Sequence, residues 1–339
     1  MRNRTLLIAA LSATILVLVS VLGVSAQKPK PIVLKWATPL PKTHPMVLPN
    51  IAWQDKITKE TNGRLQFKYY HSGTLIGPRE TYSELESGVA DGSALFAAYS
   101  PHGFEIHKAI APWMYGIPDD HKRTEIYRKI TSKFPEIDAE WTGVKILRLS
   151  TGSAYQLISV KPVHTIDDLK GLSIKVMGQY VDFIKKCGGE GIPLPMSETF
   201  ISLQKGVIDG LLAPVETLKT FKFAEVAKYV TILNLTSTTY PGEGMNWDSW
   251  NSLPPDIQKT ISDSEEWWLS EYIRVQKSKD DDGIEFAKKM GVEFIELSPK
   301  ELNRFYDVIK EVCLESAKKL DADGYPGTEM FEEMRRLAE

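Results

Sequence analysis

Few side chains in this sequence have the types and spacing that catalysis or metal binding requires. The segment HGFEIH contains His102, Glu105 and His107, but its two histidines are five residues apart. A zinc-binding helix needs two histidines four apart on one face, so we interpret these as loop or surface residues. The chain also has no GxSxG motif, no P-loop and no paired-carboxylate motif. We therefore expect no catalytic residue, no metal and no cofactor.

Charge excludes another class of partner. The chain has 41 basic and 44 acidic residues, for a net charge of −3. Nucleic-acid binding depends on basic patches that neutralise phosphates, and no basic run occurs here, so we expect no nucleic-acid partner. The adjacent Asp119 and Asp120 and the run from Asp280 to Asp282 are interpreted as solvated surface.

The first 26 residues have the pattern of a secretory signal. Two arginines precede a long apolar stretch, and Val24 and Ala26 occupy the −3 and −1 positions of a cleavage site. We expect cleavage after Ala26 and a periplasmic product. The alternative is an uncleaved anchor helix, because the apolar stretch 5–26 is long enough to cross a bilayer.

Cysteine usage is sparse. Only Cys187 and Cys313 are present, each in a helical pattern among apolar neighbours. A disulfide between them is one option in an oxidising compartment, but buried free thiols are the interpretation we favour.

The elements that would position any site alternate between strands and helices. Residues 46–61 predict a helix that ends at Asn62-Gly63, and the last third is mostly helical, including 254–291 and 300–320. This order predicts an α/β protein with largely parallel sheets. The β-rich runs are 33–38, 64–70, 144–150, 172–178, 229–236 and 292–297.

One segment occurs twice. ETYSELESGVADG (80–92) and ETFISLQKGVIDG (198–210) match at seven of thirteen positions without a gap. In each copy a glycine should end an amphipathic helix, and the Asp-Gly pair should turn the chain onto a strand edge. A repeated helix-turn-strand unit predicts two similar lobes, which would enclose a cleft.

Four segments together resemble the solute-binding proteins of tripartite ATP-independent periplasmic (TRAP) transporters, DctP type. They are ETNGRLQFKYYHSGTLIG with the following ESGVADG, KPVHTIDDLKGLSIKV, GGEGIPLPMSETFISLQKGVIDGLLAP and MNWDSWNSLPPDIQ. The resemblance implies a two-lobed, class II-like periplasmic binding protein fold with a long helix spanning both lobes at 254–291. Lobe I would comprise 27–150 with part of 236–270, and lobe II 151–235 with part of 280–339.

The resemblance also implies a function. Such a receptor captures a small organic solute, usually a carboxylate, between its lobes and delivers it to the small and large membrane subunits of a TRAP permease driven by an ion gradient. We expect a monomer without enzymatic activity. The alternatives are a secreted hydrolase that uses the same cleft, and a sensor domain anchored in the membrane by 5–26.

Site residues follow from the resemblance, with two departures. Lys175 occupies the position of the family's carboxylate-binding arginine, and keeps the charge without the planar fork. It could instead point away or pair with an acid. Ala213 replaces an asparagine that reaches the ligand in many members, and Glu216 could supply that polar contact.

The other candidate ligand contacts lie at segment ends that should face the cleft. Tyr155 stands where relatives often carry another polar contact, and His44 lies in the loop after the first strand. The remaining candidates, each of which could equally serve inter-lobe packing, are Trp36, Glu80, Tyr99, Asn246 and Trp247.

Overall fold

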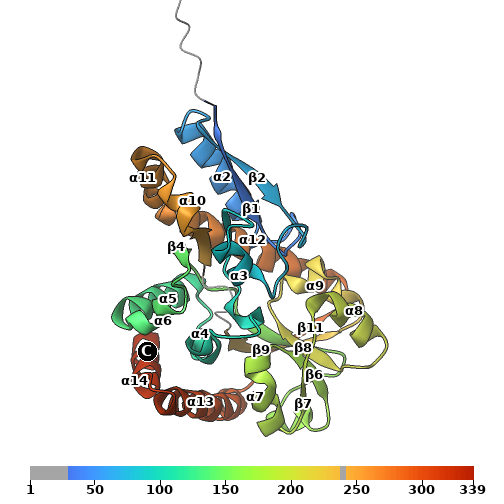
Figure 1. Cartoon of the computed structure of the whole chain (residues 1–339). Helices are drawn as coiled ribbons and strands as arrows, with labels where there is room; N and C mark the ends of the chain where they lie inside the picture. The colour runs from blue at the N-terminus through green and yellow to red at the C-terminus, as the bar shows by residue number, and fades with distance from the viewer. Residues whose placement is uncertain (1–29, 237–241) are drawn as a thin grey trace, which may run out of the picture. The chain divides into compact units, whose positions relative to one another are not determined.

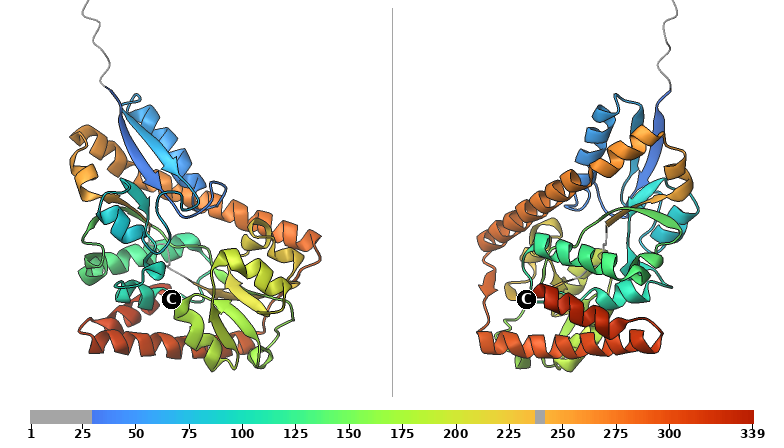
Figure 2. Two further views of the ribbon diagram at one scale, coloured as in Figure 1. Left: turned by 45° about the vertical axis from the view of Figure 1, so that its right-hand side comes forward. Right: turned by 90° about the vertical axis from the view of Figure 1, so that its left-hand side faces the viewer.

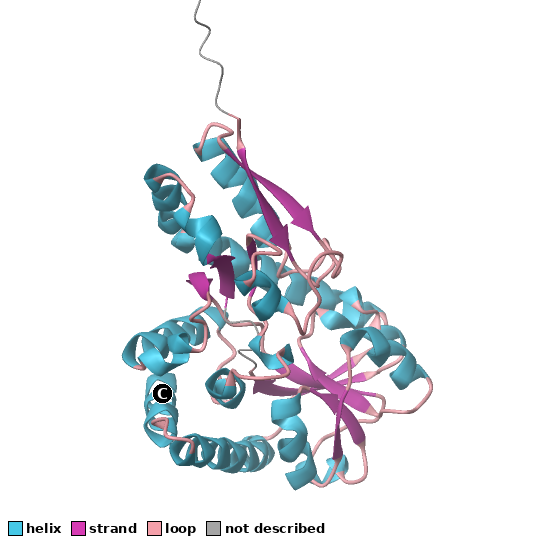
Figure 3. Ribbon diagram, viewed as in Figure 1, coloured by secondary structure: helices cyan, strands magenta, loops and turns pink. Residues whose placement is uncertain are grey.

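The strands of the protein belong to two separate sheets (Figure 3). The computed structural model describes residues 30–236 and 242–339. The predicted signal segment, 1–26, lies outside the described residues. Within the described ranges, no helix combines the length and the apolarity that crossing a bilayer requires.

The first sheet has five strands among the described residues, and the second has six (Figure 1). In spatial order, the first contains β2 (Leu65–Tyr70), β1 (Ile32–Ala37), β3 (Gly92–Ala94), β10 (Gly242–Asn246) and β4 (Val144–Leu149). The second contains β11 (Glu293–Ile295), β9 (Tyr229–Leu235), β5 (Tyr155–Ser159), β8 (Gly210–Ala213), β6 (Ser173–Val176) and β7 (Glu190–Pro193).

Both sheets are mixed, so the prediction of largely parallel sheets is wrong. β1 pairs in parallel with β3, and β6 with both β7 and β8. However, β10 runs antiparallel to its neighbours β3 and β4, and β5 to β8 and β9. Each of these two strands is the first one after the chain crosses from one sheet to the other. The strands joined by helical crossovers within a sheet run parallel to one another, and the entering strand runs in the opposite direction.

The crossings between sheets coincide with the predicted domain limits. The chain leaves the first sheet at the end of β4 and enters the second at β5; it leaves at the end of β9 and returns at β10. The assignment of 27–150 and 151–235 to separate lobes stays a prediction that is consistent with this order.

Helices cover both sheets (Figures 1 and 2). They are α2 (Leu48–Glu60), α3 (Thr81–Glu86), α4 (Glu105–Ile110), α5 (Asp120–Lys133), α6 (Pro135–Ala139), α7 (Val181–Lys186), α8 (Met196–Gln204), α9 (Thr217–Thr220), α10 (Trp247–Asn251), α11 (Pro255–Asp263), α12 (Glu265–Lys289), α13 (Pro299–Ala322) and α14 (Gly327–Ala338). Short 3₁₀ helices lie at η1 (Ala97–Tyr99), η2 (Ile166–Leu169), η3 (Gly178–Tyr180) and η4 (Phe223–Glu225).

The predicted long helix is present as two helices. It begins at Pro255, is interrupted at Ser264, and continues as α12 over 25 residues to Lys289. At 1.5 Å per residue, α12 is about 38 Å long. It packs against α2 beside the first sheet and against α9 beside the second (Figure 2, orange). One helix therefore contacts elements of both sheets.

The repeated segment folds as predicted. In each copy a glycine with positive φ, Gly88 (77°) or Gly206 (68°), follows the helix and precedes a short strand, β3 or β8. Because side chains disfavour this backbone conformation, glycine allows the sharp return of the chain.

The aspartate of each copy fixes the returning strand to its parallel neighbour. The Lys35 backbone N–H donates to Asp91 Oδ2 over 2.6 Å, and the Ser173 N–H donates to Asp209 Oδ2 over 3.0 Å. In return, the Asp91 N–H donates to the Lys35 carbonyl, and the Asp209 N–H donates to the Ser173 carbonyl. The two sheets thus use the same hydrogen-bonded connection to place the carboxyl ends of paired strands side by side.

The C-terminal helices close the main apolar core. Phe305 on α13 and Met330 on α14 pack in one cluster with Ile106, Tyr127 and Leu157. These residues come from helices beside the first sheet and a strand of the second. The C-terminal helices therefore contact more than the second sheet, with which the prediction grouped them.

Both cysteines are free and buried in this cluster, which confirms the favoured interpretation. Burial raises the pKa of Cys187 to about 12 and raises that of Cys313 as well. We expect a thiol reagent to label neither cysteine rapidly in the native protein and to label both in urea. Reductant should leave the melting temperature unchanged; a lower melting temperature under reductant would contradict free thiols.

Candidate functional site

A cavity of about 370 Å³ lies where strands of both sheets end. This volume falls within the range of pockets that hold small molecules. Residues after β1 and β3 line one part, and residues of β5, β6, β8 and the segment leading into α9 line the other. The carboxyl ends of parallel strands therefore converge on the cavity, as they do in other α/β ligand sites.

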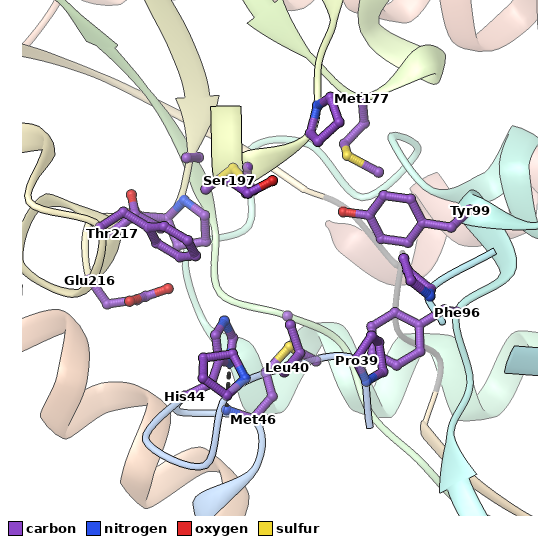
Figure 4. A pocket seen from close by; sticks show the side chains of 18 of the residues that line it. Pro39, Leu40, His44, Met46, Phe96, Tyr99, Met177, Ser197, Glu216 and Thr217 are labelled. Atoms are coloured by element: carbon purple, nitrogen blue, oxygen red, sulfur yellow. Dashed lines mark hydrogen bonds between the residues drawn. The ribbon is translucent and has the colours of Figure 1, made fainter. Parts of the chain in front are cut away.

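Most of the lining is apolar. Methionines and aromatic rings from several elements surround the cavity (Figure 4). The apolar lining residues are Pro39, Leu40, Pro41, Met46, Pro78, Phe96, Met177, Pro195, Met196, Leu212, Ala213, Pro214 and Phe221. Such walls favour the hydrocarbon part of a ligand and exclude water from its polar contacts.

Lys175 is the cationic residue that lines the cavity. It lies on β6 opposite Leu211 of β8 and is 2% exposed. Its Nζ lies 3.2 Å from the Met196 sulfur, and within the described residues it forms no ion pair. Burial lowers the pKa of Lys175 from its ordinary 10.5 to about 8, so it is mostly protonated at pH 7. The alternative in which Lys175 pairs with an acid does not hold among the described residues.

Glu216 lines the same cavity just before α9, and is 5% exposed. Thr220 donates a hydrogen bond of 2.5 Å to its Oε2. Burial, reinforced by the nearby charge of Asp280, raises the pKa of Glu216 to about 7. The charge of Lys279 opposes this shift but does not outweigh burial, so the carboxyl group is only partly compensated by positive charge.

His44 lies on the same side of the cavity as Glu216, and Tyr99 and Met177 lie on the other (Figure 4). The Met46 N–H donates to His44 Nδ1 over 3.2 Å, which leaves Nε2 as the donor of the neutral ring. Burial lowers the pKa of His44 to about 4, so it contributes no charge at pH 7. Tyr155, stacked on Tyr180, lines the cavity too.

Two of the other predicted residues lie away from the cavity in the first sheet's neighbourhood. Trp36 is fully buried on β1, and its indole N–H donates to Glu243 over 3.1 Å. Its side chain is packed into the core because strand residues alternate sides. Glu80 is exposed before α3, where its carboxyl group approaches Gly77. Their positions do not support ligand contact.

Asn246 and Trp247 also lie outside the cavity lining. Asn246 donates from its side chain to the carbonyls of Leu85 and Glu86 and caps α10. Trp247 is exposed, and its indole N–H donates to the Thr142 carbonyl. Both residues therefore have structural roles at the edge of the first sheet, which differ from the predicted ligand contacts.

In the histidine segment, His102 and Glu105 are exposed as predicted, but His107 differs from its prediction. His107 is buried, not at the surface: its Nδ1 lies 2.6 Å from Glu140, and Trp141 donates to its Nε2 over 2.7 Å. Both ring nitrogens are thus occupied by structural partners. Among the described residues, no group of three or more His, Cys, Asp or Glu side chains is arranged to hold a metal ion.

Two acids that were predicted to be solvated surface are instead partly buried. Asp120 contacts the buried Arg123 guanidinium, which also donates to the Gly152 carbonyl beside the cavity. Asp280, on α12, is half-buried, and burial together with the charge of Asp120 raises its pKa to about 7. Both acids contact or neighbour residues of the cavity lining, so the adjacent acids in the sequence wrongly predicted solvated positions for them.

The sequence reasoning also missed Gln276 on α12, which lines the cavity. It is 4% exposed, and its Oε1 has no hydrogen-bond partner among the described residues. Gln276, Asp280 and Gly283 lie on one face of α12 because they are four and seven residues apart. A Cβ at Gly283 would lie 2.5 Å from the Val215 carbonyl oxygen, so glycine allows α12 to approach the backbone beside Glu216. The spacing of these three residues indicates a shared helix face, but which face of α12 meets the cavity depends on the elements that pack against it.

The raised pKa of Glu216 leads to a stability prediction. The folded protein binds its proton more tightly than the unfolded chain, so the free energy of unfolding should fall as pH rises from 4.5 toward 7. The shift from 4.5 to about 7 corresponds to about 3 kcal/mol at most. We therefore expect the difference in the free energy of unfolding between Glu216→Gln and the wild type, both without ligand, to shift in favour of the variant from pH 5 to pH 8. Urea unfolding at the two pH values measures this difference.

Asp280 remains in that variant, so part of the decline with pH should persist. Glu80→Gln, the same chemical change at an exposed position, is the control and should show no pH-dependent difference. Equal effects of Glu216→Gln at pH 5 and pH 8 would contradict the raised pKa.

Comparison with known proteins decides the family. Residues 37–320 match the model of the bacterial extracellular solute-binding protein family 7, DctP. The chain belongs to this family. Its members are binding proteins rather than enzymes, and they act outside the cytoplasm.

Relatives and solved structures agree with this family. The chain is 24% identical to the C4-dicarboxylate-binding periplasmic protein DctP of Rhodobacter capsulatus, over 95% of this chain and 97% of that one. A Chromohalobacter salexigens solute-binding protein is 28% identical, but the match spans only 56% of this chain and 58% of that relative. A TRAP periplasmic solute-binding protein from Desulfovibrio salexigens superposes with a TM-score of 0.81 and 26% identity, over 91% of this chain and 96% of that one.

The fold of this DctP-family chain is therefore the two-sheet α/β fold of TRAP solute-binding proteins, as predicted. A Rhodoferax ferrireducens TRAP solute-binding protein in complex with benzoate has the same fold, with a TM-score of 0.79 and 22% identity over 91% and 97% of the two chains.

Proposed function

We propose that this DctP-family protein is the extracytoplasmic receptor of a TRAP transporter and binds a small organic solute that carries a carboxylate. The observation that carries the proposal is Lys175, a buried ammonium group without an ion-pair partner among the described residues, facing an apolar cavity. A buried charge is costly unless a partner compensates it, and a ligand carboxylate is such a partner.

Known ligands of relatives support an acid. One solved relative is in complex with benzoate, another has bound β-D-galacturonate, and a third has bound D-glucuronate. Each of these ligands carries one carboxylate. Lys175 binds an anion as a point charge without the fork geometry of arginine, so orientation of the solute would depend on the remaining polar residues. We propose Glu216, His44, Tyr155 and Tyr99 for that role, since all four line the cavity.

Binding would favour closure of the segments around the cavity. A ligand that takes an equilibrium from mostly open to mostly closed must prefer the closed form by roughly 5 kcal/mol. Charge-assisted hydrogen bonds contribute about 1.5 to 3 kcal/mol each, so one carboxylate on Lys175 plus a few neutral hydrogen bonds would be sufficient. Because residues from both sheets line the cavity, one ligand can contact both.

The closed, loaded protein would then be recognised by the small and large membrane subunits of the permease. We propose that the receptor is a monomer, that it reaches the periplasm by cleavage near Ala26, and that it releases its solute chemically unchanged. The alternative of a hydrolase has no support from the cavity: among its described lining residues, His44 is the one imidazole, and it has no carboxylate hydrogen-bond partner.

The test is a thermal-shift screen of the mature protein with monocarboxylates, dicarboxylates, aromatic acids, sugar acids, amino acids and neutral polyols. A solute at 100 times its dissociation constant should stabilise the protein by about 2.7 kcal/mol. Chromatography of the mixture should recover the solute unchanged. Stabilisation by polyols alone, or conversion of the solute to a product, would refute the proposal.

A further inference from the structure

The cavity is lined by opposite charges at two separate places. Lys175 lies on β6 opposite Leu211 of β8. Glu216 lies five residues after Leu211, beyond the end of β8. No ion pair joins the two side chains among the described residues, and neither charge contributes to the pKa shift of the other. An acid with a single anionic group would pair with Lys175 and bring no cationic partner to Glu216, whose side chain accepts a hydrogen bond from the Thr220 hydroxyl.

From this arrangement we propose that the solute is a zwitterion, an amino carboxylate whose carboxylate binds Lys175 and whose protonated amine binds Glu216 and Gln276. The proposal rests on the receptor function proposed above and specifies the ligand class of the same cavity. An apolar segment would join the two charged groups, because most of the cavity lining is apolar, including Met46, Phe96, Met177 and Phe221.

Glu216 and Gln276 add hydrogen-bond acceptors to a cavity lining that also contains the His44 Nε2 donor. Thr220 donates a hydrogen bond to Oε2 of Glu216. Figure 4 shows the Glu216 carboxyl group directed toward the cavity. Gln276, which is nine-tenths buried, adds an acceptor without a partner. A buried carboxyl group and an unpartnered amide oxygen among the described residues of one cavity favour a ligand group with several N–H donors.

Neighbouring cations do not already neutralise this side. His44 is the one imidazole among the described lining residues, and its Nδ1 accepts a hydrogen bond as a neutral ring does. Lys279 does contribute a favourable charge to Glu216, but its ammonium group is partly exposed and lies 3.6 Å from Asp282. Asp280 adds a second acid behind Glu216. The local charge therefore favours a cationic group over a hydroxyl, which brings one donor and no charge.

The experiment uses matched triplets with the mature wild-type protein in titration calorimetry. One triplet is phenylalanine, 3-phenylpropionate and phenylalaninamide; the other is 5-aminopentanoate, pentanoate and 5-aminopentanamide. We expect one of the two amino acids to bind at least tenfold more tightly than both its deaminated acid and its amide. An acid that binds as tightly as its amino acid would overturn the zwitterion proposal and leave the receptor function intact.

Variants test the assigned roles. Glu216→Gln should weaken amino-acid binding at least tenfold and leave binding of the deaminated acid unchanged or tighter, and Gln276→Leu should weaken only amino-acid binding. Glu80→Gln is the matched control, because Glu80 is exposed and outside the cavity lining. Equal weakening of both ligands by Glu216→Gln would refute the contact with the amine. If neither the triplets nor any acid in the wider screen binds, the receptor function itself fails.

Discussion

Replacing Lys175 by methionine will weaken solute binding by at least tenfold and will raise the melting temperature of the ligand-free protein. The loss of affinity follows from removing the cation that lines the cavity. With a charge-assisted contact of about 1.5 to 3 kcal/mol removed, the dissociation constant should rise by about 10- to 100-fold or more. Calorimetry with the acid that gives the largest thermal shift measures this change.

The gain in stability has a separate cause. A lysine whose pKa is lowered from 10.5 to about 8 is destabilised in its charged form by the fold. The cost amounts to about 3 kcal/mol at most below pH 8 and disappears as pH rises from 8 to 10.5, because the unfolded chain then releases its proton too. Methionine has a similar length and no charge, so the variant should be more stable at pH 7 and lose that advantage at pH 10.5.

Lys170→Met provides the control, because Lys170 is exposed and precedes the same strand. It should change neither the affinity nor the melting temperature by more than a few tenths of a kcal/mol. Unchanged affinity in Lys175→Met would remove Lys175 from the binding site. A lower melting temperature would mean that the ammonium group has a stabilising partner in the free protein.

The second large effect concerns a buried charge network next to the cavity. Asn50 joins its members: its Oδ1 accepts from Arg148 and Trp268, and its Nδ2 donates to Glu243 over 2.5 Å. The Arg148 guanidinium also stacks over Trp53 at 3.9 Å. Burial raises the pKa of Glu243 and lowers that of Arg148 to about 10. Each charge depends on the other for compensation.

Glu243→Leu should therefore destabilise the protein by about 3 to 5 kcal/mol, since it leaves the Arg148 charge uncompensated. The double variant Glu243→Leu with Arg148→Met should be less destabilised than Glu243→Leu alone. Urea unfolding of the four proteins gives the coupling energy. Additive single effects would show that Arg148 and Glu243 stabilise the fold independently.

The sequence predicted those elements whose stability is local. All six β-rich runs became strands, and the helix predicted for 46–61 ends at Glu60, shortly before Asn62 and Gly63, both with positive φ. The strands outside these runs are β3, β5, β7, β8 and β10, most of which are short or rich in glycine and small residues. Of these, only β3 and β8 were expected, as the strands that follow the turn of the repeated segment. In β3, a Cβ at Gly92 would lie within 2.5 Å of the Trp36 ring, so this strand depends on a neighbour distant in sequence.

The candidate site was predictable to a similar degree. Lys175, Glu216, Tyr155, His44 and Tyr99 were all selected from the sequence and all line the cavity, although their contact with a ligand stays a prediction. The misplaced residues were selected as polar or aromatic residues at segment ends, and which side of a strand such a residue faces depends on tertiary pairing. Gln276 was missed because a glutamine inside a long helix resembles any solvated position until the packing of α12 is known.

The stripe of Gln276, Asp280 and Gly283 on α12 has an evolutionary consequence. A mutation of Gln276 or Asp280 acts on the acid side of the cavity from a helix that contributes no strand-to-strand hydrogen bond, whereas Gly283 must stay glycine because any side chain there would collide with the Val215 carbonyl. Substitutions on one face of α12 could thus change which solute the receptor binds while the two sheets keep their pairing.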